Sequence, residues 1–261
     1  MSDLAGLKIL VTRPVGQSQG LMDQLAALGA QPIHFAAVEI VEPRDIASFK
    51  AVVADLSGYD WAIFISPNAV TRAFNLIQGF GQGWPATLRM AAIGRGSARE
   101  LKRLGFTDIL VPEGQFDSES LLSMEPFQDI NGQRIIVFRG EGGRELLGDT
   151  LKARGALVQY AECYRRAAPS ADVSGLLRAW ARNGLDAVIV TSVEGLHHLY
   201  DALGQVGRQW LTKTPLVVVG TRLKDACLAL GLKGPLLVAA GADDEALIAA
   251  LLAWHAGKNP L

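Results

Sequence analysis

The chain has 261 residues, of which 49% are hydrophobic, 20% charged and 7% aromatic, and this composition excludes collagen-like, disordered and disulfide-stapled proteins. A length prior of about 150 residues per domain predicts one large domain or two modest ones, and we expect two. The formal net charge of −1 gives no overall field to hold a nucleic acid or a membrane, so we expect neither partner, and an anionic ligand would need a local cluster.

Short β-branched runs alternate with helical patterns, which indicates an α/β fold with parallel sheets. Leu21, Leu25 and Leu28 form one apolar helix face, and Gly29 follows where a helix C-terminus favours a positive φ. A terminal helix is expected over residues 246–254. In the first half, strands are expected near residues 8–12, 32–38, 61–65, 90–93 and 109–111, and helices are expected to begin near Gln17, Asn68, Ser97 and Ser118.

A repeat relates the two halves of the chain. Gly29 matches Gly155, 126 positions later, and the same offset holds without a gap over most of each half. The other matched pairs are the segments 8–13 and 134–139, Leu25 and Leu151, Asp60 and Asp186, Ser66 and Ser192, Phe74 and Tyr200, Gly94 and Gly220, Gly105 and Gly231, and Asp117 and Asp243. We interpret this offset as an internal duplication, and expect two five-stranded, flavodoxin-like parallel-sheet domains.

The turns that follow the expected strands point to a ligand site. In open parallel sheets ligands bind outside the carboxyl ends of the strands, where loops turn into helix N-termini. Free backbone N–H groups and the helix dipole favour anions there, and arginine adds a bidentate grip on carboxylates. We therefore expect a polyanionic ligand. The candidate binding residues are Thr12, Arg13, Ser66, Asn68, Gly94, Ser97, Arg139, Gly140, Ser192, Gly220, Thr221 and Arg222.

The cysteines and the N-terminal residues bear on the cellular compartment of the protein. Cys163 and Cys227 lie far apart without metal-ligand spacing, which argues against a disulfide framework or a structural zinc site. Residues 1–3 open onto a strand-like run without the regions of a signal peptide, and no apolar stretch approaches the roughly 18 residues of a membrane span. We expect a cytoplasmic protein without a bound metal.

Three other kinds of site come into question: a dinucleotide-binding loop, a serine nucleophile and a metal site. Gly140 and Gly142 open a helix after a strand, as in dinucleotide-binding folds, with Glu162 at the distance of a ribose-binding acid. Position 145 is Glu where the third small residue is needed, so a tight turn explains the glycines better.

A serine nucleophile at Ser66 or Ser192 would need a base and a strained elbow motif, so we expect both to cap helices instead. The four histidines lack metal-ligand spacing and are expected to fill surface or core positions. They are His34, His197, His198 and His255.

Several motifs, in their order and spacing, resemble those of the uroporphyrinogen-III synthase family over nearly the whole chain. They are Leu7 to Pro14, Phe64 to Val70, Ala92 to Ala98, Arg139 to Leu147, Tyr164 to Arg166, and Val219 with Gly220. The resemblance implies two α/β domains, one of residues 1–37 with 167–261 and one of residues 40–163, joined by a two-stranded linker at 38–40 and 163–166.

The resemblance also implies an activity. The family cyclises the linear tetrapyrrole hydroxymethylbilane with inversion of the fourth ring, ring D, and loss of water, without metal or cofactor. It implies a polycarboxylate substrate, handover from hydroxymethylbilane synthase, and a monomer.

Residue roles follow only where this chain matches the family. Tyr164 matches the family's linker tyrosine, a candidate general acid, although an aromatic residue bracing the linker is the competing explanation. Ser97 stands where relatives often have threonine, and Ser192 matches a serine of the family's cleft. Leu223 departs from a threonine common in relatives, so a catalytic role there is in doubt, and Arg222 is expected to bind a carboxylate instead.

A second class of function fits the same residues. Two equal lobes without acid–base pairs also suit a binding or sensor protein that closes on an anionic metabolite without chemistry. Turnover of hydroxymethylbilane distinguishes the two hypotheses.

Overall fold

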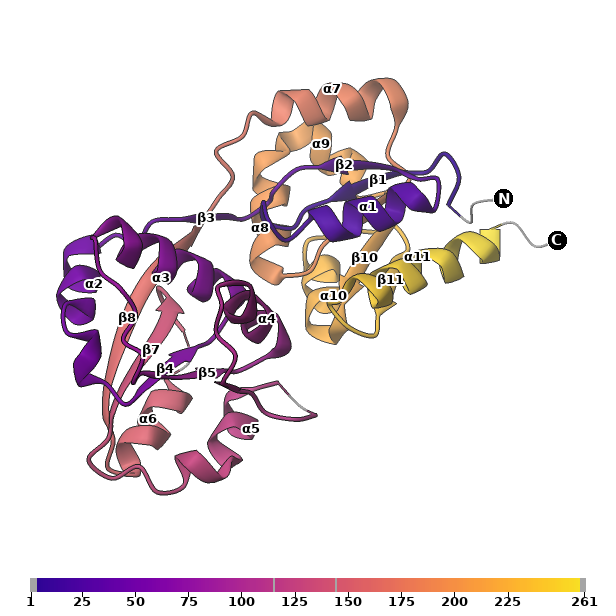
Figure 1. Ribbon diagram of the computed structural model, residues 1–261. Helices are drawn as coiled ribbons and strands as arrows, with labels where there is room; N and C mark the ends of the chain where they lie inside the picture. The colour runs from indigo at the N-terminus through magenta and orange to yellow at the C-terminus, as the bar shows by residue number, and fades with distance from the viewer. Residues whose placement is uncertain (1–3, 115, 144, 259–261) are drawn as a thin grey trace. The chain divides into compact units, whose positions relative to one another are not determined.

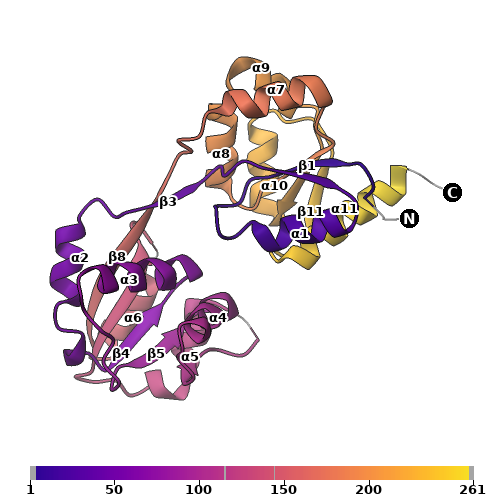
Figure 2. The same ribbon diagram turned by 45° about the horizontal axis from the view of Figure 1, so that its top comes forward.

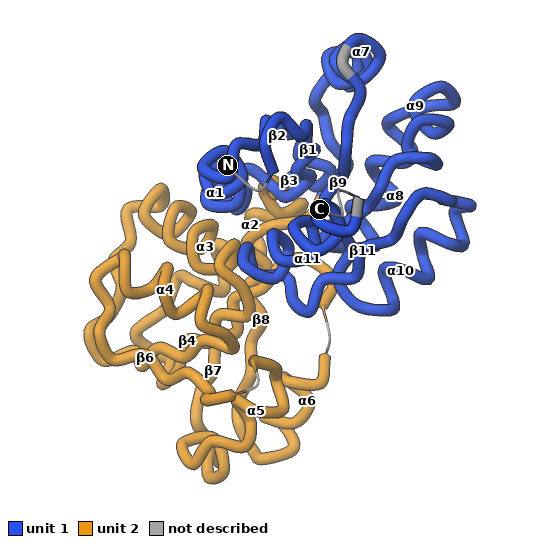
Figure 3. Tube along the Cα trace, turned by 90° about the vertical axis from the view of Figure 1, so that its right-hand side faces the viewer, with its two compact units in different colours: residues 1–39, 167–261 blue, residues 40–166 orange. Residues whose placement is uncertain are grey.

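The computed structural model describes residues 4–114, 116–143 and 145–258 (Figure 1). The chain forms two compact units: unit 1, residues 1–39 with 167–261, and unit 2, residues 40–166 (Figure 3). Residues 1–3, on which the expectation about a signal peptide rests, lie outside the described residues. In the described part of the chain, no helix combines the length and apolar character of a membrane span.

Unit 1 is built on a parallel sheet, five-stranded within the described residues, in the order β11-β10-β9-β1-β2. The edge position of β2 accommodates Pro32, which has no N–H to donate to a neighbouring strand. The strands are β1 (Lys8–Val11), β2 (Gln31–His34), β9 (Ala187–Ile189), β10 (Leu216–Val219) and β11 (Leu236–Ala239).

Helices cover both faces of this sheet (Figure 2). Leu21 and Leu251, from α1 (Gln19–Ala27) and α11 (Asp244–Lys258), pack in one hydrophobic cluster with Ile9 and Val11. The opposite face is covered by α7 (Val173–Asn183), α8 (Val193–Ala202), α9 (Gly204–Leu211) and α10 (Gly220–Ala229), which pack against Leu10, Val188 and Val218. The expected terminal helix is confirmed by α11.

Unit 2 has the same layered construction. Its sheet has the order β3-β8-β7-β4-β5-β6 in the described residues, and the pairs from β8 to β6 are parallel. The strands are β3 (Glu39–Val41), β4 (Trp61–Phe64), β5 (Arg89–Ala92), β6 (Ile109–Leu110), β7 (Arg134–Gly140) and β8 (Leu157–Ala167). One face carries α2 (Ile46–Val53), α3 (Pro67–Gly79) and α4 (Arg95–Arg103), and the other carries α5 (Ser118–Ser123) and α6 (Leu146–Ala153).

The predicted α/β class with parallel sheets is confirmed, and two details of the prediction are wrong. The strand expected over residues 32–38 ends at His34: Phe35 and Ala37 still donate to Val11 and Thr12, but the chain there is irregular. Residues 39–41 instead form β3 beside β8, so the sheet of unit 2 has six strands among the described residues rather than five.

Helix α2 was not anticipated, although local chemistry explains its start. Asp45 caps it by accepting a 2.8 Å hydrogen bond from the Ser48 N–H. At the other end of a helix, the prediction for Gly29 is confirmed, because it follows α1 with φ 82°. Gly155 follows α6 with φ 86°, and a side chain there would also collide with Asn131.

The two points where the chain enters and leaves unit 1 are tied together. The Glu39 carboxylate accepts hydrogen bonds of 2.7 Å from both the N–H and the hydroxyl of Ser170. These bonds to Ser170 lower the pKa of Glu39, because they stabilise the ionised carboxylate.

The two cysteines provide a test of the packing. Cys163 and Cys227 are free and fully buried, and burial raises their pKa values to about 12 and about 11. We expect no reaction of the native protein with a disulfide thiol reagent at pH 8, because the reactive thiolate is scarce and covered. After unfolding in urea the same reagent should titrate both thiols. Rapid reaction of either thiol in the native protein would contradict the packing described above.

Candidate functional site

The predicted site residues of unit 2 lie where its strands end. Ser66 and Asn68 follow β4, Gly94 and Ser97 follow β5, and Gly140 is the last residue of β7. Because these neighbouring strands are parallel, their carboxyl ends share one edge of the sheet. Ser97 is only 2% exposed, so it contributes to the packing of α4 rather than to an open surface.

Ser66 caps α3 as predicted. Its Oγ accepts a 3.0 Å hydrogen bond from the Ala69 N–H, and the second hydroxyl contact of Ser66 is with Tyr164, 3.1 Å from Oγ to Oη. Ser192 caps α8 in unit 1 in the same way, accepting a 3.0 Å bond from the Gly195 N–H. The prediction that both serines act as helix caps is confirmed.

Gly140 and Tyr164 are paired residues of β7 and β8 and lie unusually close together. A Cβ atom on Gly140 would lie 2.7 Å from two ring carbons of Tyr164 and 3.1 Å from its Oη. Tyr164 is 3% exposed and belongs to the hydrophobic cluster that also contains Phe64, Phe138 and Cys163. Gly140 is therefore needed for the position of the tyrosine ring.

Tyr164 borders a cavity of about 450 Å³ in unit 2. The cavity is also lined by Ile65, by the glycine-rich residues 140–143 and by Arg166. The phenolic hydroxyl, the backbone of residues 140–143 and the guanidinium of Arg166 can hydrogen-bond to a polar ligand, while the lining also includes Glu141, whose carboxylate is paired with Arg44.

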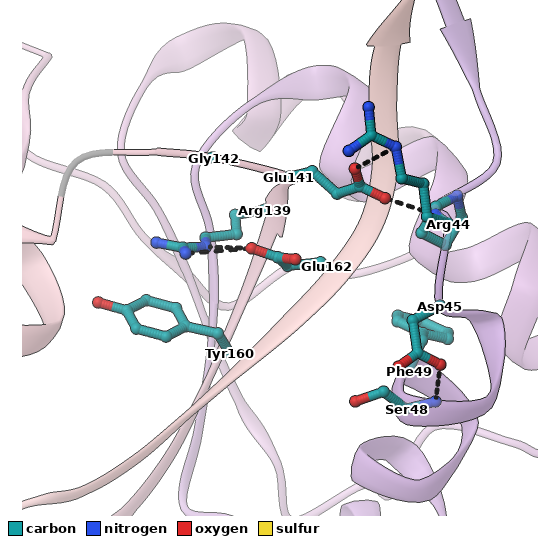
Figure 4. A pocket seen from close by; sticks show the side chains of 10 residues that line it. Arg44, Asp45, Ser48, Phe49, Arg139, Glu141, Gly142, Tyr160 and Glu162 are labelled. Carbon is teal, nitrogen blue, oxygen red and sulfur yellow. Dashed lines mark hydrogen bonds and ion pairs between the residues drawn. The ribbon is translucent and has the colours of Figure 1, made fainter.

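Arg139 lies in a second cavity of unit 2, of about 530 Å³ (Figure 4). Its Nη1 donates to Glu145 over 2.9 Å, and its Nε and Nη2 donate to Glu162 over 3.3 and 3.1 Å. The guanidinium also stacks 3.9 Å above the centre of the Tyr160 ring. Arg139 is thus already paired with two carboxylates of its own chain.

These contacts change the acidity of the cluster. Burial disfavours the charged guanidinium, but the bonds to Glu145 and Glu162 outweigh it and raise the pKa of Arg139. The bond from Arg139 lowers the pKa of Glu145. Burial and the neighbouring Glu145 raise the pKa of Tyr160 to about 12, so this phenol stays protonated.

The cavity around Arg139 carries more acids than bases. Asp45, Glu141 and Glu162 face two arginines, and Arg44 is itself bonded through its N–H and guanidinium to Glu141 (Figure 4). A polycarboxylate would be repelled by this excess of negative charge. The strand-end cavity at Tyr164 is lined by one acid, Glu141, and one arginine, Arg166, so it lacks this excess of acids and is the better candidate for an anionic ligand.

Arg139 and Tyr164 lie on opposite faces of the sheet. Alternate residues of β7 pack on opposite faces: Val137 belongs to the cluster under α5 and α6, and Phe138 belongs to the cluster under α3. Arg139 continues on the first of these faces, over Tyr160, whereas Tyr164 packs with Phe138. The structure does not bring these two predicted site residues together.

In unit 1, the arginine after β1 is likewise paired. Arg13 donates to the carboxylate of Asp244 and to the carbonyl of Ala242, both near the start of α11. The hydroxyl of Thr12, which is 4% exposed, donates to the Ile189 carbonyl over 2.7 Å, so it ties β1 to β9. Sequence reasoning could not foresee these partners, because they lie more than 170 positions away along the chain.

Strand β10 passes directly into α10, and the first residues of this helix are exposed. Gly220 begins α10 with φ 70°, and Thr221 and Arg222 are exposed. Leu223 is 2% exposed and belongs to the core, so the position where relatives commonly have threonine is occupied here by a packing residue. Ser192, after β9, is exposed.

The other kinds of site are not supported. Glu162 is engaged by Arg139, and Gly142 has φ 65°, as a tight turn requires. His34 contacts the Arg13 carbonyl and His198 the Ala37 carbonyl. Within the described residues, no group of three or more His, Cys, Asp or Glu side chains could hold a metal ion.

Sequence reasoning missed several residues around the cavities. Glu145 was noted only as a mismatch to the dinucleotide pattern, and Arg44, Glu141 and Tyr160 were not identified as candidates. The alternation of β8 was the available signal, because it places Tyr160 and Glu162 on one face.

Two α/β units, each built on a parallel sheet with hydroxyl, glycine and arginine residues at the carboxyl ends of its strands, place the chain in the class of α/β proteins, in which ligands commonly bind at such strand ends. Residues 19–249 match the family model described as "Uroporphyrinogen-III synthase HemD". The uroporphyrinogen-III synthase of Salmonella typhimurium is 37% identical over 94% of this chain and 100% of its own length, and that of Escherichia coli is 36% identical with the same coverage. The chain therefore belongs to the uroporphyrinogen-III synthase family.

Solved structures agree on the fold. The uroporphyrinogen-III synthetase of Helicobacter pylori aligns with a TM-score of 0.62 at 15% identity, over 95% of this chain and 99% of the other. A mutant uroporphyrinogen III synthase from Thermus thermophilus aligns with a TM-score of 0.58 at 20% identity, over 97% of this chain and 100% of the other.

The contact between Gly140 and Tyr164 gives the first prediction for this site. Gly140→Ala should lower the free energy of unfolding by about 1–3 kcal/mol, because the methyl group overlaps a packed ring. Gly143→Ala is the matched control: its Cβ would lie 3.7 Å from its nearest neighbour, an ordinary contact, so its stability should stay within about 0.5 kcal/mol of the parent. Urea unfolding measures both, and equal effects would exclude the overlap.

The ion pair between Arg139 and Glu145 predicts how the stability of the fold depends on pH. Arg139 holds the pKa of Glu145 below its ordinary 4.5, so this ion pair stabilises the fold above about pH 4.5 and is lost as the pH falls through the folded-state pKa. Glu145→Gln should therefore lose less stability than the parent between pH 7 and pH 3.5. Urea unfolding at the two pH values measures the difference, and parallel losses would contradict the ion pair.

Proposed function

We propose that the chain cyclises hydroxymethylbilane to uroporphyrinogen III, with inversion of ring D and loss of water, as a step of tetrapyrrole biosynthesis. The observation that carries the proposal is the 37% identity to a synthase over that protein's entire length. The hydroxyl and glycine residues at the strand ends of both units support it, because they suit a polycarboxylate. The comparisons do not favour the alternative of a binding or sensor protein.

The first chemical task is departure of the hydroxymethyl oxygen. In the proposed step Tyr164 gives its phenolic proton to this oxygen as the carbon–oxygen bond breaks, and water leaves. The electron pair of the adjacent pyrrole nitrogen stabilises the carbon left behind. A proton lost from the substrate when the last pyrrole regains aromaticity returns to the phenolate, so the enzyme ends unchanged. The position of Tyr164 beside the cavity of unit 2 supports this role.

The second task is to choose the carbon that attacks. Closure with inversion requires the substituted carbon of ring D to bond to the electrophilic carbon first, giving a spiro intermediate. The bond from that ring D carbon to its original methylene bridge then breaks, and the bridge rejoins ring D at its unsubstituted carbon, which loses its proton. Holding the chain in that pose is a contribution of orientation, which can supply several kcal/mol without an acid or a base. In this proposal the reaction needs neither metal nor cofactor.

Candidate substrate-binding residues are proposed in each unit. Exposed Ser192, Thr221 and Arg222 are available in unit 1, with the backbone of Gly220. In unit 2, Asn68, Gly94 and Gly140 follow or end strands beside Ser66. Thr12, Arg13, Ser97 and Arg139 remain proposed to act at the site, but their burial or ion pairs support a positioning role better than direct contact with the substrate.

The chain organisation is also proposed. The compact units 1–39 with 167–261 and 40–166 support the domains expected at 1–37 with 167–261 and at 40–163. An internal duplication is supported by register: Lys8 pairs with Gln31, and Arg134 pairs with Leu157, each 126 positions later. We further propose a cytoplasmic monomer that receives its substrate from hydroxymethylbilane synthase.

The activity is tested directly. Purified protein is supplied with hydroxymethylbilane formed in place by hydroxymethylbilane synthase, and the products are oxidised and separated as porphyrin isomers. We expect isomer III. Isomer I alone would overturn the proposed function, and tight binding of hydroxymethylbilane without turnover would support the binding or sensor protein.

Tyr164→Phe tests the acid. We expect kcat to fall by roughly 100-fold, at the low end of general-acid contributions, while the product remains isomer III because orientation is supplied by other groups. Steady-state rates and isomer analysis measure both effects. Unchanged kcat would leave Tyr164 as a brace of the strand only.

A further inference from the structure

A β-bulge at Cys163 aims Tyr164. Arg139 pairs with Glu162, but the next residue of β7, Gly140, pairs with Tyr164, so Cys163 is an extra residue in β8. In a regular strand Glu162 and Tyr164 would share a face. With the bulge, Cys163 and Tyr164 both pack in the hydrophobic cluster under α3, and Glu162 bonds to Arg139 on the other face.

The re-aimed tyrosine meets Ser66 at the N-terminus of α3. The Ser66 hydroxyl has one hydrogen to donate and two lone pairs to accept with. One lone pair accepts the Ala69 N–H over 3.0 Å, and the second contact joins Oγ to the Tyr164 Oη over 3.1 Å. The hydroxyl pair is only partly buried, in contrast to the tyrosine ring.

The direction of this hydrogen bond decides what Tyr164 can do. If Tyr164 donated to Ser66, the phenolic hydrogen would be used in that bond, and only the lone pairs of the phenolic oxygen would be available to a ligand. If Ser66 donates, the phenolic hydrogen is available to a ligand in the adjoining cavity. A phenolate left after proton transfer would then accept the Ser66 hydrogen, near the positive end of the 13-residue helix α3.

We propose that Ser66 is a positioning residue that donates its hydroxyl hydrogen to Tyr164 Oη, so that the phenolic proton is directed at the substrate oxygen and the resulting phenolate is stabilised. This inference rests on the proposed function, and it assigns Ser66 a task other than binding a substrate carboxylate. Helix capping is retained, because the cap uses the lone pair and the proposed bond uses the hydrogen.

Two substitutions separate the hydroxyl from the cap. Ser66→Gly removes the hydroxyl, yet glycine at an N-cap costs only a few tenths of a kcal/mol relative to serine. Ser66→Thr keeps the hydroxyl. We expect Ser66→Gly to lower kcat roughly tenfold, the equivalent of one hydrogen bond, with KM nearly unchanged, and Ser66→Thr to restore most of the rate.

A double-mutant cycle with Tyr164→Phe isolates the pair. Without the phenolic oxygen Ser66 has no acid to position, so adding Ser66→Gly to Tyr164→Phe should change kcat by less than about twofold. Asp172→Gly is the control for loss of a cap: Asp172 accepts a 2.8 Å bond from the Ser174 N–H at the start of α7, and this variant should keep the parent kcat. Melting curves check that every variant is folded.

Three results would overturn the inference. An equal loss of kcat from Ser66→Gly with and without the Tyr164 hydroxyl would show that the serine acts independently. A raised KM with unchanged kcat would make Ser66 a substrate ligand. Failure of Ser66→Thr to restore the rate of a folded protein would show that loss of the hydroxyl is not the cause of the lower rate. Formation of isomer III by the parent protein in the same assays keeps these results separate from a failure of the proposed function.

Discussion

Parallel strand pairing is the constraint on which the rest of this structure depends. The five strands β1, β2, β9, β10 and β11 of unit 1 run the same way, and so do β8, β7, β4, β5 and β6 of unit 2. Their carboxyl ends must therefore meet at one edge of each sheet. Residues far apart in the chain, such as Ser66 and Tyr164, become neighbours through this arrangement, and helix N-termini with unpaired N–H groups collect beside them.

Features fixed by local chemistry could be predicted from the sequence. Ser66 and Ser192 were recognised as caps because a serine oxygen before a helix can accept a hydrogen bond from a backbone N–H of its first turn. Gly29 was recognised because only glycine readily takes a positive φ after a helix. These requirements involve neighbours within a few residues, so a single sequence contains them.

Features fixed by pairing between distant segments could not be predicted. The extra residue at Cys163 is visible only once β8 is laid against β7, because nothing in the residues 162–164 marks a change of register. The pairing of the short strand β3 with β8 is likewise not visible in the sequence, where residues 39–41 look like a continuation of the preceding strand. The partners of Arg13 and Arg139 are further examples, since both arginines looked available for a ligand.

The paired arginines change how anion binding in this family member is understood. Arg139 is 8% exposed, and an unpaired charge at that depth would be costly, so Glu145 and Glu162 are needed to keep it buried. Such an arginine is a poor partner for a substrate carboxylate, because the ligand would have to displace a bond that already offsets the cost of burial. In the proposed function, attraction for a polyanion comes instead from exposed groups such as Arg222 and from backbone N–H groups at the strand ends.

The two explanations of Tyr164, as a brace and as an acid, use different parts of the side chain. Its ring lies close to the backbone of Gly140 and is buried in the hydrophobic cluster that also contains Phe138, which stabilises the bulged end of β8. Its hydroxyl reaches past that cluster to Ser66 and borders the cavity. A proton donor needs an oxygen in a fixed position and a hydrogen that can bond to the ligand. A buried ring fixes the position of the oxygen and does not occupy the hydrogen. Bracing the strand is therefore the physical condition under which this tyrosine can act as an acid.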